Sequence, residues 1–200
     1  MGQQQRGEET RSRILDAAAE RFAQHGYAAT SVMEICQRAR VTKGAFYHHF
    51  PSKQTVFLEL LNRWLLGLDE RLAEARAKAS SVPEGILSMA DQAQHVFNMA
   101  EGQLAIFLEF WIEAGHDPAI WQATIAPYRR YRDFFSNIVR AGIAEGTLRQ
   151  IDPEMAAQVI VSLAAGLMLQ GVFDPKGADW GQVARQSIQM LLEGLERKRA

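Results

Sequence analysis

The stretch from residue 30 to residue 52, TSVMEICQRARVTKGAFYHHFPS, constrains the fold more than any other part of the chain. Ser31 and Glu34 have the spacing of a capping box, in which each side chain satisfies a backbone N–H group of the other residue. Thr42 is a second N-cap candidate, and Pro51 ends the helix that follows it. The stretch therefore predicts two short helices joined by a tight turn, which is a helix-turn-helix.

The second of these predicted helices has an unusual sequence for a helix at a protein surface. KGAFYHHF combines a cation, two small residues, and aromatic and imidazole side chains. Small residues let the N-terminus of a helix lie close to a DNA duplex, while lysine, tyrosine and histidine reach phosphates or base edges. The sequence indicates DNA binding here, with two small capped core helices as the alternative.

The segment VTKGAFYHHFPSK, with its lead-in TRSRILDAAAERFAQHGYAATSVMEI, resembles the tetracycline-repressor (TetR) family of bacterial transcription regulators. The detailed resemblance covers residues 8 to 55. Members commonly have glycine in the turn at the position of Arg40. Arginine tolerates the left-handed backbone of such a turn less well than glycine does.

The resemblance implies an all-α fold of nine helices and two domains. Residues 1–52 would form a three-helix DNA-binding domain of the helix-turn-helix type, and residues 53–200 a ligand-binding and dimerisation domain. The protein would be a homodimer through its last two helices, bind a palindromic operator, and act as a repressor released by a small apolar or amphipathic molecule. The residues predicted to contact DNA are Arg11, Thr30, Ser31, Arg40, Thr42, Lys43, Gly44, Ala45, Tyr47, His48 and Lys53.

The charge distribution agrees with a protein that meets DNA at one end. Residues 1–55 hold eight Lys or Arg and five acidic residues, a net charge of +3. Of the totals of 22 basic and 23 acidic residues, 14 and 18 remain for the rest of the chain, a net charge of −4. A basic head on an acidic body favours local DNA binding over nonspecific coating of nucleic acid.

Apolar periodicity, interrupted by glycine and proline, predicts helices and no strands along the whole chain. Residues 3–9 are expected to be a disordered arm. The predicted helices cover residues 10–24, 31–40, 43–50, 53–79, 84–100, 104–114, 118–144, 153–172 and 179–198.

Large aromatic side chains crowd the middle of the chain. They predict either an ordinary core or an apolar pocket for a flat or aliphatic ligand. Two carboxylates four residues apart would favour a cationic ligand in such surroundings. The candidate pocket residues are Trp64, Phe97, Phe107, Glu109, Phe110, Trp111, Glu113, Tyr131 and Phe134.

The sequence contains no motif for catalysis, a cofactor or a metal ion. Glycine-rich phosphate loops and HExxH are absent, and the single cysteine, Cys36, is expected to be a buried core thiol. The polar opening MGQQQRGEETR lacks a signal peptide, and the apolar run 155–173 is broken by polar residues and glycines. We therefore expect a cytoplasmic regulator that is not an enzyme, needs no cofactor and does not contact a membrane.

Two other functions remain open at this point. One is a dimeric DNA-binding regulator that binds no small molecule and acts through a protein partner. The other is an all-α enzyme or ligand carrier that does not bind DNA.

Overall fold

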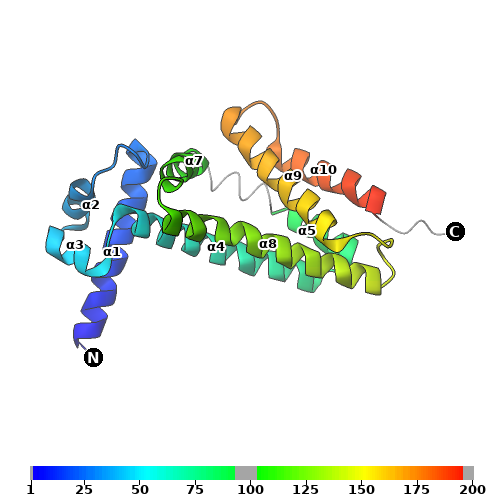
Figure 1. The fold of residues 1–200 in the computed structure, drawn as a ribbon, viewed down its shortest axis with the longest axis horizontal. Coiled ribbons are helices and arrows are strands. Elements are labelled where there is room, and N and C mark those ends of the chain that lie inside the picture. Colours follow the sequence, from blue (N-terminus) through cyan, green and yellow to red (C-terminus); the bar gives the residue numbers. More distant parts are fainter. Residues whose placement is uncertain (1, 93–102, 196–200) are drawn as a thin grey trace. The chain divides into compact units, whose positions relative to one another are not determined.

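The computed structural model describes residues 2–92 and 103–195, and within these ranges every regular element is an α-helix (Figure 1). The nine described helices confirm the predicted all-α class. They are α1 (Gly2–His25), α2 (Val32–Ala39), α3 (Lys43–His49), α4 (Lys53–Lys78), α5 (Val82–Ala90), α7 (Gln103–Ala114), α8 (Pro118–Ala144), α9 (Pro153–Phe173) and α10 (Trp180–Leu195).

The helix boundaries follow the local signals in most places. The carboxylate of Asp152 accepts the N–H groups of Glu154 and Met155 at 2.9 and 3.2 Å, with Pro153 in the first turn, so this cap fixes the start of α9. The expected arm at residues 3–9 is wrong, because α1 already begins at Gly2. Glutamine, arginine and glutamate are good helix formers, so the residues of this type at positions 3–9 extend α1 toward the N-terminus instead of forming a disordered arm.

The chain divides by its contacts into two compact units. The first contains Met1–Leu66 and Ala105–Thr124, and the second contains Gly67–Leu104 and Ile125–Ala200. Helices α4 and α8 therefore each contribute residues to both units. The compact units do not follow the predicted boundary at residue 52, which stays a prediction about how the functions are divided.

The core of the first unit is built around aromatic rings. Tyr27 is fully buried, and its ring centroid lies 5.3 Å from Phe22, 5.3 Å from Phe57 and 5.1 Å from Phe110. These partners come from α1, α4 and α7 respectively. Cys36 of α2 is buried in the same core, as expected, and burial raises the pKa of its thiol.

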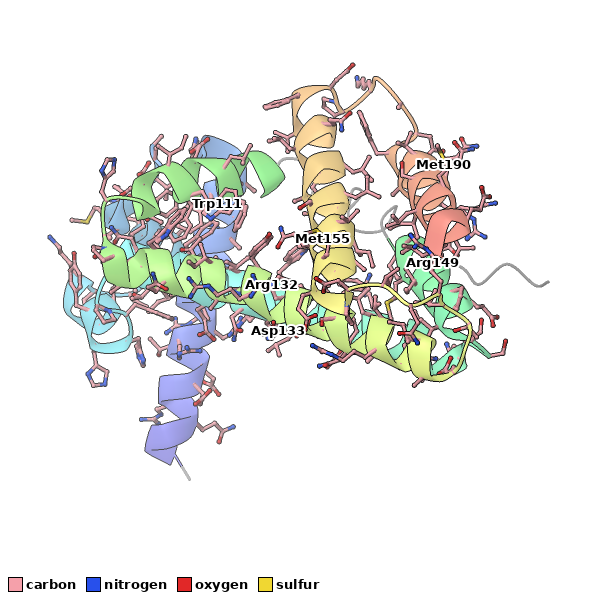
Figure 2. All side chains as sticks on the ribbon, turned by 45° about the vertical axis from the view of Figure 1, so that its right-hand side comes forward. Trp111, Arg132, Asp133, Arg149, Met155 and Met190 are labelled. Carbon is pink, nitrogen blue, oxygen red and sulfur yellow. The ribbon has the colours of Figure 1, made fainter. Side chains whose placement is uncertain are left out.

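In the second unit, α10 packs against α5 and α9. Arg149, in the loop after α8, caps the C-terminal end of α10 by hydrogen bonds to its last carbonyl oxygens (Figure 2 labels Arg149). The Arg149 guanidinium donates to the carbonyl oxygen of Gly194 at 2.9 Å, and its backbone N–H donates to that of Leu195 at 3.0 Å. A cation at a helix C-terminus also complements the helix dipole.

Candidate nucleic-acid interface

Helix α2 begins at a complete capping box. The hydroxyl oxygen of Ser31 accepts the N–H group of Glu34 at 3.2 Å, and the Glu34 carboxylate accepts the N–H and hydroxyl groups of Ser31, both at 2.7 Å. The hydrogen bonds from the Ser31 side chain and backbone lower the pKa of Glu34. The predicted spacing is confirmed, and Ser31 is exposed at the start of the helix.

Helix α2 ends in a strained turn at Arg40. Its φ and ψ angles are 55° and 48°, the left-handed region, and its N–H group donates to the carbonyl oxygens of Cys36 and Gln37. Among the described residues it is the only one other than glycine with a positive φ. The strain expected from the sequence is therefore present, and it is retained at an exposed basic residue beside α3.

Replacing Arg40 with glycine is expected to raise the free energy of unfolding by up to about 1 kcal/mol. A left-handed residue with a Cβ atom is strained by about 1–2 kcal/mol, of which the greater unfolded-state entropy of glycine offsets about 0.5–1 kcal/mol. The measurement is the midpoint of urea unfolding. Gln37→Gly, an exposed position inside α2, is the matched control and should lose about 1 kcal/mol. An Arg40→Gly midpoint below that of the wild type would contradict the assignment of strain.

Helix α3 has a buried face and an exposed face. Thr42 caps the helix, with its hydroxyl oxygen accepting the N–H group of Ala45 at 3.1 Å. Phe46 is fully buried in the core of the first unit, whereas the next residue, Tyr47, is 46% exposed. The exposed face is therefore free to meet a partner while the buried face holds the helix in place.

The exposed face of α3 carries the chemistry that DNA recognition needs. The ammonium group of Lys43 lies 5.9 Å above the ring of Tyr47, and His48 is exposed beside them. A Cβ atom on Gly44 would meet only the Thr42 hydroxyl, at 3.9 Å. Packing within the chain thus does not require glycine there, and its missing side chain leaves room for a close approach.

Thr30 and Arg11 have other partners. Thr30 is 2% exposed, and its hydroxyl donates to the carbonyl oxygen of Gly26 at 2.7 Å. The Thr30 side chain is thus hydrogen-bonded within the protein, and its contact with DNA stays a prediction. The Arg11 guanidinium is half-buried, 3.1 Å from the Glu59 carboxylate and 5.1 Å from the ring centroid of Phe50.

Lys53 also points into the protein. Its ammonium group donates to the carbonyl oxygens of Tyr27 at 2.8 Å, Thr30 at 3.0 Å and Ala28 at 3.4 Å. Burial lowers the pKa of Lys53, and the negative charges of Glu113 and Glu109 oppose this shift. Three carbonyl oxygens thus accept the three N–H bonds of the ammonium group, and the phosphate contact of Lys53 stays a prediction that would require it to give up one of them.

The remaining predicted DNA contacts lie at the N-cap of α2, in the turn between α2 and α3, and on α3. Ala45 is partly buried and the others are exposed. The exposed residues are Ser31, Arg40, Thr42, Lys43, Gly44, Tyr47 and His48.

The candidate pocket residues Phe110 and Glu109 have structural roles in the first unit. Phe110 is fully buried and stacks on Phe57 with ring centroids 4.2 Å apart, so it belongs to the core of the first unit, and its assignment to a ligand pocket stays a prediction. The Glu109 carboxylate accepts the N–H group of Ala28 at 3.1 Å. The sequence carries no local sign of this contact, because 81 residues separate the two partners.

The other pocket candidates divide between the two units. In the first unit the candidates Phe107 and Trp111 form a partly exposed row with Trp121, which was not a candidate, and the centroids are 5.4 and 6.3 Å apart from one ring to the next (Figure 2 labels Trp111). The same unit holds half-buried Trp64 and Glu113.

In the second unit the Tyr131 hydroxyl donates to the Asp69 carboxylate at 2.7 Å, and Phe134 packs edge-on against Phe135. Phe97 lies outside the described residues. No group of three His, Cys, Asp or Glu side chains suited to a metal ion occurs in the part of the chain that the structure describes.

Two family models match the chain and together span most of it. Residues 14–60 match the model "Bacterial regulatory proteins, tetR family", and residues 75–197 match "BetI-type transcriptional repressor, C-terminal". Among solved structures, the regulator FadR from Bacillus subtilis in complex with stearoyl-CoA aligns with a TM-score of 0.76 at 20% identity, over 92% of this chain and 98% of that one. At this identity the likeness concerns the fold.

Curated relatives extend the match along the chain. The A-factor receptor protein of Streptomyces griseus is 30% identical over 190 residues, which is 92% of this chain but only 63% of that protein. The HTH-type transcriptional regulator AcrR of Shigella flexneri is 28% identical over 199 residues, covering 94% of this chain and 90% of AcrR.

Proposed function

The chain belongs to the TetR family of bacterial regulatory proteins, and on that premise we propose that it is a dimeric repressor of transcription that binds a palindromic operator through α3. The observation that carries this proposal is the division of α3 into a buried anchor, Phe46, and an exposed face with Lys43, Tyr47 and His48. Lysine and histidine on that face supply contacts to phosphates, and tyrosine supplies a contact to a phosphate or a base edge.

A second copy of the chain is the proposed partner of α9. The helix exposes Met155, Val159, Leu169 and Phe173, which lie on one face at helical spacing. By length and composition α9 would also pass for a membrane span, although apolar helices covered by other protein pass the same test. Several large apolar side chains exposed along one face of a helix are a mark of a protein interface.

Dimerisation also follows from the demands of DNA recognition. A single helix α3 reads only a few base pairs, whereas a two-fold dimer presents two of them to successive major grooves. Met190 of α10 is 73% exposed and would lie in the same interface (Figure 2 labels Met155 and Met190). We therefore propose that α9 and α10 pair with the same helices of the second copy.

The proposed effector is a small apolar or amphipathic molecule that releases the operator. FadR, with its bound stearoyl-CoA, shows that this fold accommodates an amphipathic ligand. In this chain the partly exposed row of Phe107, Trp111 and Trp121 supports an apolar ligand. By contrast, the core role of Phe110 and the contact from Glu109 to Ala28 favour a regulator without a small-molecule effector.

The experiment that tests the proposal is a selection of bound duplexes from a random library at near-physiological salt. The expected result is an enriched palindrome whose half-sites are separated by about one helical turn or somewhat more. A folded protein that enriches no sequence would refute operator binding. The selected duplex then serves to screen compounds, and a panel in which none releases it would favour the regulator without a small-molecule effector.

A further inference from the structure

The loop between α1 and α2, residues 26–30, is held by charged side chains from two distant helices. Lys53 at the start of α4 binds three of its carbonyl oxygens, and the Lys53 ammonium group also lies 4.2 Å from the ring centroid of Tyr27. Glu109 of α7 binds the N–H group of Ala28 from the same loop. Helix α4 thus binds carbonyl oxygens of the loop, and α7 binds one of its N–H groups.

The Glu109 carboxylate also lies close to the glycine that begins the loop. Gly26 has a φ of +82°, and a Cβ atom there would lie 2.9 Å from both oxygens of the Glu109 carboxylate. The flexible end of the Glu109 side chain could shift away from such an atom, whereas a positive φ strains any residue with a side chain. Glycine at position 26 therefore serves the turn, and it also leaves room for the Glu109 carboxylate.

The position of this loop determines where α2 begins. Ala28 lies three residues before Ser31, the N-cap of α2. Between them, the Thr30 carbonyl is held by Lys53 and the Thr30 hydroxyl is bonded to Gly26. A displacement of Ala28 is therefore passed to the first turn of α2, and from there to the helix-turn-helix.

Helix α7 is well placed to act on this loop. It lies inside the region matched by the C-terminal family model, residues 75–197, yet its contacts put it in the same compact unit as α1, α2 and α3. It also inserts Phe110 into the aromatic core, edge-on to Tyr27 at 5.1 Å. One helix thus supplies both a packing contact and a hydrogen bond to the base of the DNA-binding segment.

We propose that Glu109 is a positioning residue for operator binding, which holds the α1–α2 loop through Ala28 and thereby couples α7 to the helix-turn-helix. This inference rests on the proposed function. Because coupling between two sites is reciprocal, a change in α7 alters operator affinity, and operator binding in turn stabilises α7. The reciprocal direction allows a test in which no effector is needed.

The test compares Glu109→Ala with two matched variants. Glu109→Gln keeps a carbonyl acceptor for Ala28, and Glu113→Ala removes the carboxylate one turn further along α7, which acts on Tyr27 and Lys53 through its charge. Glu109→Ala should bind the selected operator about tenfold more weakly, the effect of one hydrogen bond lost in each protomer. The two matched variants should stay within about threefold of the wild type.

Hydrogen exchange separates positioning from a general loss of stability. In the wild type, operator should slow amide exchange in α2, α3 and residues 107–113 of α7. In Glu109→Ala the protection of α2 and α3 should remain, while that of α7 disappears. Equal protection of α7 in the two proteins would overturn the inference alone. A wild type that retains no duplex would overturn the proposed function, and this inference with it.

Discussion

Replacing Tyr47 with alanine should reduce operator affinity at least about 30-fold while leaving the fold and the dimer intact. The ring of Tyr47 is 46% exposed and belongs to the face of α3 that carries Lys43 and His48. A good contact to DNA contributes about 1–3 kcal/mol, and a two-fold dimer loses it twice. At about 1.4 kcal/mol per tenfold change, the combined loss of about 2–6 kcal/mol is about 30-fold or more.

The stability of the variant should hardly change, for a reason visible in the neighbouring residue. Phe46 fills the core, whereas Tyr47 touches it only edge-on, with ring centroids 5.3 Å apart. Surface substitutions of this kind alter the free energy of unfolding by about 0.5 kcal/mol or less. Thermal melting, sedimentation and operator titration on the same samples check the three parts of this prediction.

Tyr47→Phe is the control that separates the ring from the hydroxyl. If the hydroxyl donates to a phosphate, this variant should lose most of the affinity; if the ring packs on the DNA, it should keep most of it. A Tyr47→Ala protein that binds the operator as tightly as the wild type would show that α3 docks through another face.

Replacing Leu169 with aspartate should convert the dimer into a folded monomer. Leu169 lies on the exposed apolar face of α9 and is 39% exposed in the single chain, so a charge there remains hydrated when the chain is alone. In a two-fold interface the same substitution occurs on both sides, and each buried carboxylate is penalised by several kcal/mol. A total of about 4 kcal/mol or more weakens dimerisation at least about 1,000-fold.

The loss of dimerisation in Leu169→Asp should also weaken operator binding. Two linked reading heads bind more tightly than one by about 100- to 10,000-fold, and the monomer loses this advantage. Leu66→Asp is the matched control, since Leu66 of α4 is 51% exposed and lies outside the α9 face. Sedimentation across a concentration series provides the measurement. A Leu169→Asp protein that dimerises like the wild type would place the interface on another surface.

Local signals in the sequence were sufficient to locate α2 and α3. The caps at Ser31 and Thr42 and the stop at Pro51 act within one helical turn, so the limits of α2 and α3 follow from short-range chemistry. Arg40 could likewise be singled out, because the left-handed turn depends on a single residue. Within this segment, propensity and packing favour the same structure.

Contacts between residues far apart in the sequence could not be predicted from such local signals. A lysine in the first turn of a helix is chemically suited to a phosphate, but Lys53 finds carbonyl oxygens 23 to 26 residues earlier in the chain. Thr30 has a residue type that suits DNA contact and is nevertheless buried by the packing of the loop. Aromatic residues on α7 have similar sequence surroundings, yet Phe110 enters a core and Trp111 remains partly exposed. Only the tertiary arrangement decides these roles.

The first compact unit is assembled from two separate stretches of chain, with Ala105–Thr124 completing Met1–Leu66. An amino-terminal fragment cut after α4 would leave Tyr27 and Phe57 without Phe110, their neighbour from α7. Residues 1–66 alone therefore lack part of the core of the DNA-binding unit and should not fold as an independent domain. A chimaera that exchanges it between relatives should fold only if the α7 segment is exchanged together with it, and sequence changes in the two stretches should be inherited as one set.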